Sequence, residues 1–473
     1  MFLLVGAIFT FSVRAIAEPD IWWHLRNAAH LIQLHSLPRV DTYSFTAAGA
    51  PSLDFEWLSE VPFFLAFRAM GLQGVLIVYF TVLVLIYAGV YYRSCRAGAD
   101  CKSATIATLF AILCGIVSIG PRMLLVGWLC MVGLLIVLDH FRETGKGLWI
   151  LPPLFALWIN FHGSWLFGIV VVGITIACGL LDGDWGLVSA RRWSPLELKK
   201  LLLALSASLA ALFANPYGYK LVLYPFDLLF RQKDVMQHLE EWKSVPFTGG
   251  TGKLALVLIF ALPAAALFSR RRWRPDEILL MAFALWASLS HMRFLFFAGL
   301  IAAPIFAPSL KLLPPYDRKL DKPWLNAGIM VSIVAALIFF FPSMAELQQQ
   351  MSDKYPIAAL AFMQQNHLGG RTFNNYGWGG FMEWSAPDLK PFIDGRADIF
   401  IYNGTFDGYL DATLLRNPLA VFDKYKIDYA LLEPGQPLSY LLRHSSAWKP
   451  VYSDRVAVLF GRTAITAAAV PKN

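Results

Sequence analysis

The sequence predicts an α-helical protein that crosses a membrane many times and ends in a small α/β domain. Of its 473 residues, 57% are hydrophobic and only 15% are Asp, Glu, Lys or Arg, against about 25% charged residues in soluble globular proteins. Apolar runs recur as far as Pro342, whereas residues 343–473 are more polar and carry twelve residues of each charge. This composition excludes a soluble enzyme, a disordered chain and a small disulfide-built scaffold.

Eleven apolar segments are candidates for membrane-spanning helices. A bilayer core about 30 Å thick needs about 20 apolar residues in a helix. Ala15, Ile16 and Ala17 ahead of Glu18 also resemble a signal-peptidase site, but no Lys or Arg precedes the first apolar run, so we interpret that run as an uncleaved span. The predicted spans are residues 2–17, 71–92, 104–119, 123–139, 147–162, 164–182, 199–214, 252–268, 277–292, 294–310 and 324–342.

The distribution of Lys and Arg predicts how these spans are oriented. Basic residues are concentrated in alternate loops, at 93–102, 142–146, 191–200, 270–274 and 311–322. Because basic loops stay on the cytoplasmic side, the N-terminus is expected inside and the tail after Pro342 outside. The same bias explains the net charge of +8, and no groove of aromatic and basic residues suited to nucleic acid is evident. We therefore expect membrane lipids, and no nucleic acid, as partners.

Three segments are predicted outside the membrane: the first outer loop (residues 18–70), a second loop (215–250) and the tail (343–473). The first loop is predicted to begin with an amphipathic helix over residues 20–34 that rests on the membrane surface. A second such helix, over residues 56–70, is predicted to lead into the next span.

The tail alternates helical and strand-like patterns, which predicts a small α/β domain. The glycine-rich segment 376–381 is not followed by a predicted helix, so the pattern does not favour a nucleotide site, and residues 394–396 are predicted to form a turn. The predicted elements are helices at 354–367, 408–425 and 438–445, strands at 371–373, 380–384, 391–393 and 429–432, and a hairpin at 451–461.

Polar side chains gather at the outer ends of the predicted spans. At 1.5 Å per helical residue, these side chains lie about 22 to 30 Å from the cytoplasmic ends of their spans. They therefore share a leaflet with Glu18 and Asp20, while the middles of the spans are nearly bare of charge. A transporter is expected to keep ionisable groups near the midplane instead. The residues concerned are Arg122, Asn160, His162, Asn215, His291 and Arg293.

This distribution suits an amphiphilic substrate with a polar reactive head. Glu18 and Asp20 are candidates for a general base or for binding a divalent cation, and Arg122 and Arg293 for binding a lipid phosphate. The histidines His24, His162 and His291 could donate to the phosphate or to a sugar. Structural alternatives stay open. The acidic pair could oppose a helix dipole, and Arg122 could simply extend its charged group to the membrane surface. His162 could pair with Asn160.

A second acidic group in the first outer loop is interpreted as structural. Asp41 is predicted to cap the turn that leads into a short extended segment, and Glu56 stands in the first turn of the helix that it opens. Asp54 and Glu60 complete this group.

Several segments together resemble bacterial integral-membrane glycosyltransferases of the GT-C fold, of the protein mannosyltransferase and aminoarabinose transferase type. The likeness covers nearly the whole chain and consists of a many-spanning topology with an acidic motif in the first outer loop. In this sequence Glu18-Pro19-Asp20 stands where many relatives have Asp-Asp, Asp-Glu or Asp-X-Asp. The segments that carry it are residues 18–25, 38–46, 56–60, 160–164, 215–218, 376–380 and 394–396.

The resemblance implies a GT-C-like module over residues 1–342 and an extracytoplasmic domain over 343–473. It implies transfer of a sugar, with inversion, from a polyprenyl-phosphate donor to a lipid, glycan or protein acceptor at the outer face of the bacterial cytoplasmic membrane. Asp20, or its neighbour Glu18, would be the base, and metal dependence stays open. The alternative is a non-catalytic transporter or assembly scaffold with an external binding domain.

Overall fold

A computed structural model describes residues 2–13, 18–118, 120–231, 240–269, 271–310, 314, 319 and 321–463. The possible cleavage site at residues 15–17 lies outside these described residues, as do Arg270 and Lys311 of the predicted cytoplasmic loops. The chain divides into two units: unit 1 comprises Met1–Arg14 and Leu76–Pro342, and unit 2 comprises Ala15–Val75 and Ser343–Asn473. The predicted domain boundary after Pro342 thus coincides with a unit boundary, but the first outer loop belongs with the tail.

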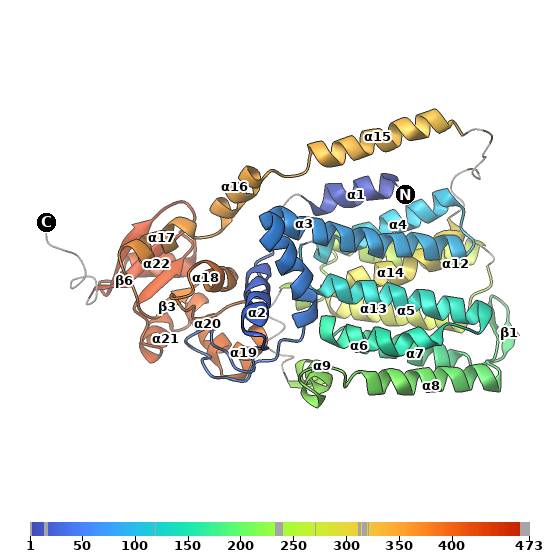
Figure 1. The fold of residues 1–473 in the computed structure, drawn as a ribbon, viewed down its shortest axis with the longest axis horizontal. Helices are drawn as coiled ribbons and strands as arrows, with labels where there is room; N and C mark the ends of the chain where they lie inside the picture. The colour runs from blue at the N-terminus through green and yellow to red at the C-terminus, as the bar shows by residue number, and fades with distance from the viewer. Residues whose placement is uncertain are drawn as a thin grey trace. The chain divides into compact units, whose positions relative to one another are not determined.

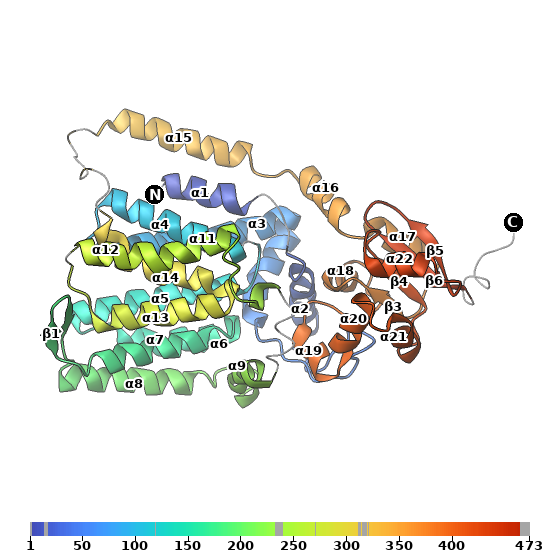
Figure 2. The same ribbon diagram turned by 180° about the vertical axis from the view of Figure 1, so that it is seen from behind.

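Unit 1 is a helical bundle in which α4 to α8, α13 and α14 lie side by side (Figures 1 and 2). Helix α3 (Trp57–Arg96) contributes its second part, and a short hairpin of β1 (Gly183–Trp185) and β2 (Val188–Ala190) joins α7 to α8. The other helices are α1 (Phe2–Ser12), α4 (Cys101–Gly115), α5 (Leu124–Thr144), α6 (Leu151–Phe161), α7 (Trp165–Cys178), α8 (Pro195–Ala211), α9 (Tyr219–Arg231), α11 (Gly250–Leu256), α12 (Leu262–Ser269), α13 (Pro275–Ser290), α14 (Leu295–Phe306) and α15 (Pro323–Phe339).

Helix α14 is the centre of this bundle, and all of its residues are buried. Trp128 of α5 stacks on Phe297 with ring centroids 5.6 Å apart. Gly299 faces α4 so closely that a β-carbon there would lie 2.8 Å from Cβ of Cys114. The absent side chain allows the two helices to approach, and the aromatic residues fill the remaining space.

Each predicted span overlaps a helix, but far fewer than eleven helices meet the requirements for crossing a membrane. Among the described residues, four segments are long and apolar enough: Trp57–Arg96, Cys101–Ser118, Leu124–Thr144 and Met292–Ser309. A fifth is counted if α15 and α16 (Met344–Lys354), which are bent by 53°, form one span. Other predicted spans are shorter or interrupted; the span at 252–268 is divided by a π-helical turn, Val257–Ala261. The count of eleven therefore stays a prediction.

Unit 2 contains a four-stranded sheet in the order β3-β4-β6-β5. Strand β3 (Thr372–Asn374) is parallel to β4 (Tyr429–Leu432), and β4 and β5 (Trp448–Ser453) are antiparallel to β6 (Val458–Arg462). All four residues of β4 are buried, as expected for a central strand. The helices are α2 (Ile21–Leu34), the first part of α3, α16, α17 (Ile357–Gln365), α18 (Gly379–Ser385), α19 (Ala397–Tyr402), α20 (Thr405–Thr413), α21 (Pro418–Lys424) and α22 (Pro437–Arg443).

The tail confirms most of the predicted elements and corrects three. The predicted strand at 380–384 is helix α18, so a helix does follow the glycine-rich segment. Residues 391–393 form no strand and contribute one bridge, between Thr372 and Pro391. The predicted helix at 408–425 is two helices, α20 and α21, separated where Leu415 adopts a positive φ of 58°.

Helix α2 forms where it was predicted, and it packs on protein; that it also rests on a membrane surface stays a prediction. It packs on α18, and Trp22 lies edge-on to Phe381 and Tyr355, with centroids 5.2 Å and 5.8 Å away. His24 and Asn27, assigned to its polar side, are also buried. The tryptophans at 22 and 23 give the helix a second apolar face, so it lies in the core of unit 2.

Candidate functional site

The acidic pair that opens α2 lies against the tail within unit 2. The backbone of Gly395 is in contact with the Asp20 carboxylate, and a β-carbon added there would overlap an Asp20 oxygen. Asp20 is half-buried and makes no capping hydrogen bond to α2. The alternative that the acidic pair opposes the dipole of α2 stays open, since Asp20 stands directly before this helix.

Glu18 is more enclosed than Asp20, with only 3% of its surface exposed. Burial lowers the pKa of Lys354, and the Glu18 charge acts in the opposite direction. Burial also raises the pKa of Tyr355, with smaller contributions from the charges of Glu18 and Asp20. Glu18 thus lies close enough to Lys354 and Tyr355 of the tail for its charge to affect their pKa values. Asp20 keeps partial access to solvent.

His24, predicted to bind substrate, faces carboxylates through both ring nitrogens. Its Nδ1 lies 2.7 Å from Oε1 of Glu60, and its Nε2 lies 3.5 Å from Oε2 of Glu56. All three side chains are buried. While these contacts persist, neither nitrogen of His24 faces a phosphate or a sugar.

The neighbouring carboxylates carry shifted pKa values. Burial raises the pKa of Asp54 to about 6. Glu60 lies in the first part of α3, ahead of the break at Gly71. Burial raises the pKa of Glu60, and the charges of Asp54 and Glu56 raise it further. Carboxyl groups that share a buried site oppose one another's ionisation, so burial and the neighbouring charges act against the ionised form of Glu60. The sequence-based assignment of this group to structure is consistent with these contacts.

A buried ionic network around Arg396 was not anticipated from the sequence. Arg396 donates to Asp394 through Nε at 2.9 Å and through Nη2 at 2.6 Å, and to Glu383 at 3.2 Å. Its Nη1 lies 2.8 Å from Oδ1 of Asp41, and the guanidinium group lies over the Tyr43 ring. One arginine therefore compensates three carboxylates, one from the first outer loop and two from the tail.

The pKa values within this network follow from its geometry. Burial raises the pKa of Glu383, and the adjacent Asp394 charge raises it further. Burial also acts to raise the pKa of Asp394, but the Arg396 charge outweighs it and the net shift is downward. The predicted turn at 394–396 is confirmed, since the Arg396 N–H donates to Oδ1 of Asp394 at 2.9 Å. The predicted Asp41 cap is also confirmed, by hydrogen bonds from Ser44 N–H and Oγ.

In unit 1, Arg122 and Arg293 converge on one carboxylate, that of Glu241. Nη1 of Arg293 lies 3.1 Å from Oε1 of Glu241, and Arg122 donates to Oε2 of the same group. Arg293 also lies over the Trp242 ring at 4.6 Å. Burial alone raises the pKa of Glu241, but the charges of Arg293 and Arg122 outweigh it and lower this pKa to about 2. Arg122 therefore forms an ion pair with Glu241 and does not only extend toward the membrane surface. Glu241 was not identified as a site residue from the sequence.

His291 lies beside this arginine pair, with its Nδ1 2.7 Å from the Trp242 carbonyl oxygen. Asn160 has a different role in unit 1: its Nδ2 donates to the Ala214 carbonyl oxygen at 2.9 Å and so holds α6 to the segment after α8. His162 accepts a hydrogen bond at Nδ1 from the Ser164 N–H, at 2.9 Å. The structure thus brings Arg122, Arg293 and His291 together in unit 1. Glu18, Asp20 and His24 all belong to unit 2, where His24 faces Glu56 and Glu60.

Among the described residues, no group of three or more His, Cys, Asp or Glu side chains is arranged to hold a metal ion. The divalent cation considered for Glu18 and Asp20 stays a prediction, because Mg²⁺ is commonly held by one or two carboxylates together with substrate phosphates.

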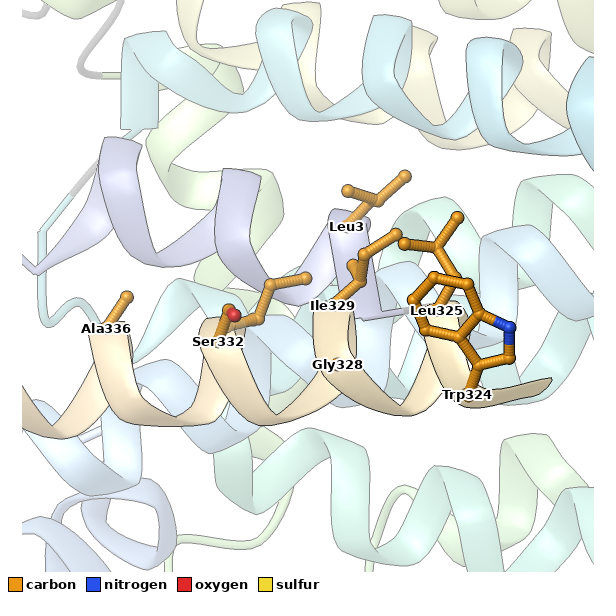
Figure 3. Close-up of a pocket in the computed structure, with 8 residues that line it drawn as sticks. Leu3, Trp324, Leu325, Gly328, Ile329, Ser332 and Ala336 are labelled. Carbon is orange, nitrogen blue, oxygen red and sulfur yellow. The ribbon is translucent and has the colours of Figure 1, made fainter. Parts of the chain in front are cut away.

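An apolar groove of about 440 Å³ lies between α1 and α15 in unit 1. Leu3 of α1 faces Leu325 and Ile329 of α15, and Ser332 supplies the one hydroxyl in its lining (Figure 3). The groove holds no titratable side chain and is therefore not a candidate for the reacting centre.

Comparison with known protein families finds no matching family model, and a search of curated proteins finds no match. The resemblance to GT-C glycosyltransferases therefore rests on the sequence motifs and the predicted topology alone.

Proposed function

We propose that the protein is a membrane glycosyltransferase that transfers a sugar from a polyprenyl-phosphate donor to an acceptor at the outer face of the bacterial cytoplasmic membrane. The proposal includes a GT-C-like arrangement of about eleven spans, with the N-terminus inside and the tail outside. The observation that carries it is the convergence of Arg122 and Arg293 on a single anionic group. Two guanidinium groups that bind both oxygens of one carboxylate also suit two oxygens of a phosphate.

In this proposal the donor phosphate takes the place of the Glu241 carboxylate. Glu241 lies in a short 3₁₀ turn, Glu240–Trp242, within the predicted second outer loop, and it compensates the two arginines when no donor is bound. Donor binding then exchanges one anion for another, so that the arginines are never left buried without a partner. As the anomeric C–O bond breaks, the same arginines stabilise the negative charge that develops on the leaving polyprenyl phosphate.

Asp20 is the base in the proposed reaction. The acceptor hydroxyl attacks the anomeric carbon, its proton passes to the Asp20 carboxylate, and the polyprenyl phosphate leaves with the bonding electrons, which inverts the configuration. Asp20 is favoured over Glu18 because it is half-buried and retains access to solvent, whereas Glu18 is enclosed. Contact with Gly395 fixes the position of the Asp20 carboxylate, as a general base requires.

Asp20→Asn tests this assignment in the full-length protein reconstituted into lipid nanodiscs. A panel of polyprenyl-phosphate sugars is supplied with lipid, glycan and peptide acceptors, and the release of polyprenyl phosphate is measured by mass spectrometry. We expect turnover to fall by about 10² to 10⁴-fold, with donor binding and the unfolding temperature unchanged. The control is Asp411→Asn, which affects an exposed pair with Arg416. Normal turnover by Asp20→Asn would overturn the role of Asp20.

Arg122→Gln with Arg293→Gln tests the phosphate site independently. We expect the double variant to lose donor binding, whether or not a productive acceptor has been found. If the wild-type protein turns over no donor, and solute flux appears in vesicles without any lipid-linked sugar, the alternative of a transporter or assembly scaffold replaces the glycosyltransferase proposal.

A further inference from the structure

A second site rich in arginine lies in unit 1, away from the arginine pair on Glu241. It is a cavity of about 280 Å³ between the end of α7, the β1–β2 hairpin and the start of α13. Figure 2 shows the hairpin at one end of the helical bundle, close to α7 and α13. The charged side chains that line the cavity are Arg142, Arg191, Arg272, Arg274 and Asp276.

The walls of this cavity are held by backbone hydrogen bonds. The Ser189 N–H donates to the Trp273 carbonyl at 2.9 Å, and the Trp273 N–H donates to the Leu187 carbonyl at 2.7 Å. These bonds fix the hairpin to the chain that enters α13. On the opposite side the guanidinium group of Arg142 lies 4.8 Å from the centre of the Trp193 ring. The cavity is therefore preformed, which lowers the entropic cost of binding a ligand.

Positive charge exceeds negative charge among the lining side chains, with four arginines to one carboxylate. Asp276 forms ion pairs with two of these arginines. Nη2 of Arg142 donates to its Oδ2 at 2.9 Å, and Nε of Arg274 lies 3.4 Å from its Oδ1. That Nε is buried and makes no hydrogen bond, although buried donors are nearly always satisfied. Nη2 of Arg274 also lies 3.6 Å from Oε1 of Glu277, so the donor that its carboxylates leave unused is Nε.

The other two arginines stand at the rim. Arg191 pairs with Glu197 and Arg272 pairs with Asp184, and both arginine side chains are 67% exposed. Exposed pairs of this kind contribute about 0 to 1 kcal/mol, so an incoming anion can compete for these guanidinium groups at little cost. Each guanidinium carries five N–H donors in a planar fork, which matches the oxygens of a phosphate.

We propose that this cavity binds the phosphate of an anionic phospholipid headgroup. The predicted orientation places these basic loops on the cytoplasmic side, where anionic lipids meet basic pockets between helices. The volume corresponds to about nine water molecules, enough for a phosphodiester with a glycerol group. The same chemistry would also accept free phosphate or a nucleotide, and the experiment separates these sources.

The test is native mass spectrometry of the full-length protein in detergent, titrated with phosphatidylglycerol or with phosphatidylcholine. We expect phosphatidylglycerol to bind at least tenfold more tightly, and the variant Arg191→Gln with Arg272→Gln to lose this preference. Arg416→Gln with Arg455→Gln is the matched control, because these arginines form exposed pairs with Asp411 and Asp353. Arg142 and Arg274 are left unchanged because they compensate the buried Asp276.

A parallel titration with inorganic phosphate and with ATP identifies the source of the anion. If inorganic phosphate or ATP binds the wild-type protein, and phosphatidylglycerol binds no more tightly than phosphatidylcholine, the lipid assignment is overturned. An undiminished preference in the Arg191/Arg272 variant would overturn the site itself. If the double variant fails to fold, each single variant supplies the same comparison.

Discussion

The backbone of Gly395 lies directly against the carboxylate of Asp20, so that no side chain can be placed between them. This contact joins the Asp-Gly-Arg turn of the tail to the acidic motif of the first outer loop, both within unit 2. Glycine is required at position 395 for reasons of space, since a β-carbon would also lie 2.9 Å from Nε1 of Trp23. The position of the proposed base therefore depends on a residue far from it in sequence.

The first prediction concerns this contact. Gly395→Ala should displace the Asp20 carboxylate and reduce sugar transfer by about 10²-fold, the loss that a shift of about 1 Å can cause. The measurement is release of polyprenyl phosphate under the conditions used for Asp20→Asn. Gly435→Ala is the control, because a β-carbon at Gly435 meets nothing within 4 Å. Equal turnover by both alanine variants would mean that the Gly395 contact does not position the base.

The second prediction concerns Glu241 as an internal competitor for the arginine pair. Glu241→Gln should increase affinity for polyprenyl phosphate, because Arg122 and Arg293 no longer share a carboxylate. We expect Kd to fall by about tenfold, which corresponds to about 1.4 kcal/mol, measured by native mass spectrometry. Glu143→Gln, which affects an exposed pair with Arg96, should leave Kd unchanged. Weaker binding by Glu241→Gln would show that Glu241 supports the site instead of occupying it.

The third prediction concerns the ionic network of unit 2. Arg396→Met should destabilise unit 2 by about 3 to 5 kcal/mol, since it leaves buried carboxylates without compensation. Arg396→Lys should destabilise it less, because lysine restores the charge but not the fork of donors. Arg416→Met is the control and should change stability by less than about 1 kcal/mol, because its pair with Asp411 is exposed. Limited proteolysis in a denaturant series measures all three, and equal stability of the Met variants would contradict the role given to Arg396.

The fourth prediction concerns pH. The folded-state pKa of Asp54 is raised from 3.8 to about 6 by burial, so its neutral form favours folding. Its contribution is fully present below about pH 4 and is lost as the pH rises through about 6. Asp54→Asn stays neutral and should be more stable than the wild type at pH 7, by up to about 3 kcal/mol, and no more stable at pH 4. Unfolding of both proteins at pH 4, 5, 6 and 7 checks this, and a difference independent of pH would contradict it.

The sequence predicted those elements whose pattern is local. The β4 strand, the helix at α2 and the helix at α17 were all recognisable from their own residues. Helix α18 was not, because Phe381 and Trp384 favour a strand in isolation and the helix is stabilised by packing on α2. The apolar face of α2 was predicted, but its packing on α18 was not.

The candidate site shows the same limit. Glu18 and Asp20 were recognisable because they form a motif of neighbouring residues. The partner of Arg122 was not, because Glu241 is 119 residues away and no periodicity connects them. Arg396 and Glu383 were missed for a related reason: the sequence shows a turn and an apolar segment, and only the fold brings their charges together.

Unit 2 is built from two segments that are far apart in the sequence, and this has a consequence for how the protein is synthesised. Its first part ends at Val75 and its second part begins at Ser343, so the ribosome must translate Leu76–Pro342, which is 267 residues, before the two parts can meet. At bacterial and eukaryotic elongation rates this takes roughly 13 to 53 s. Throughout that interval the nascent helix α2 displays Trp22 and Trp23 without the α18 surface that later covers them. We therefore expect the yield of folded protein to depend on how these indole rings are shielded during synthesis.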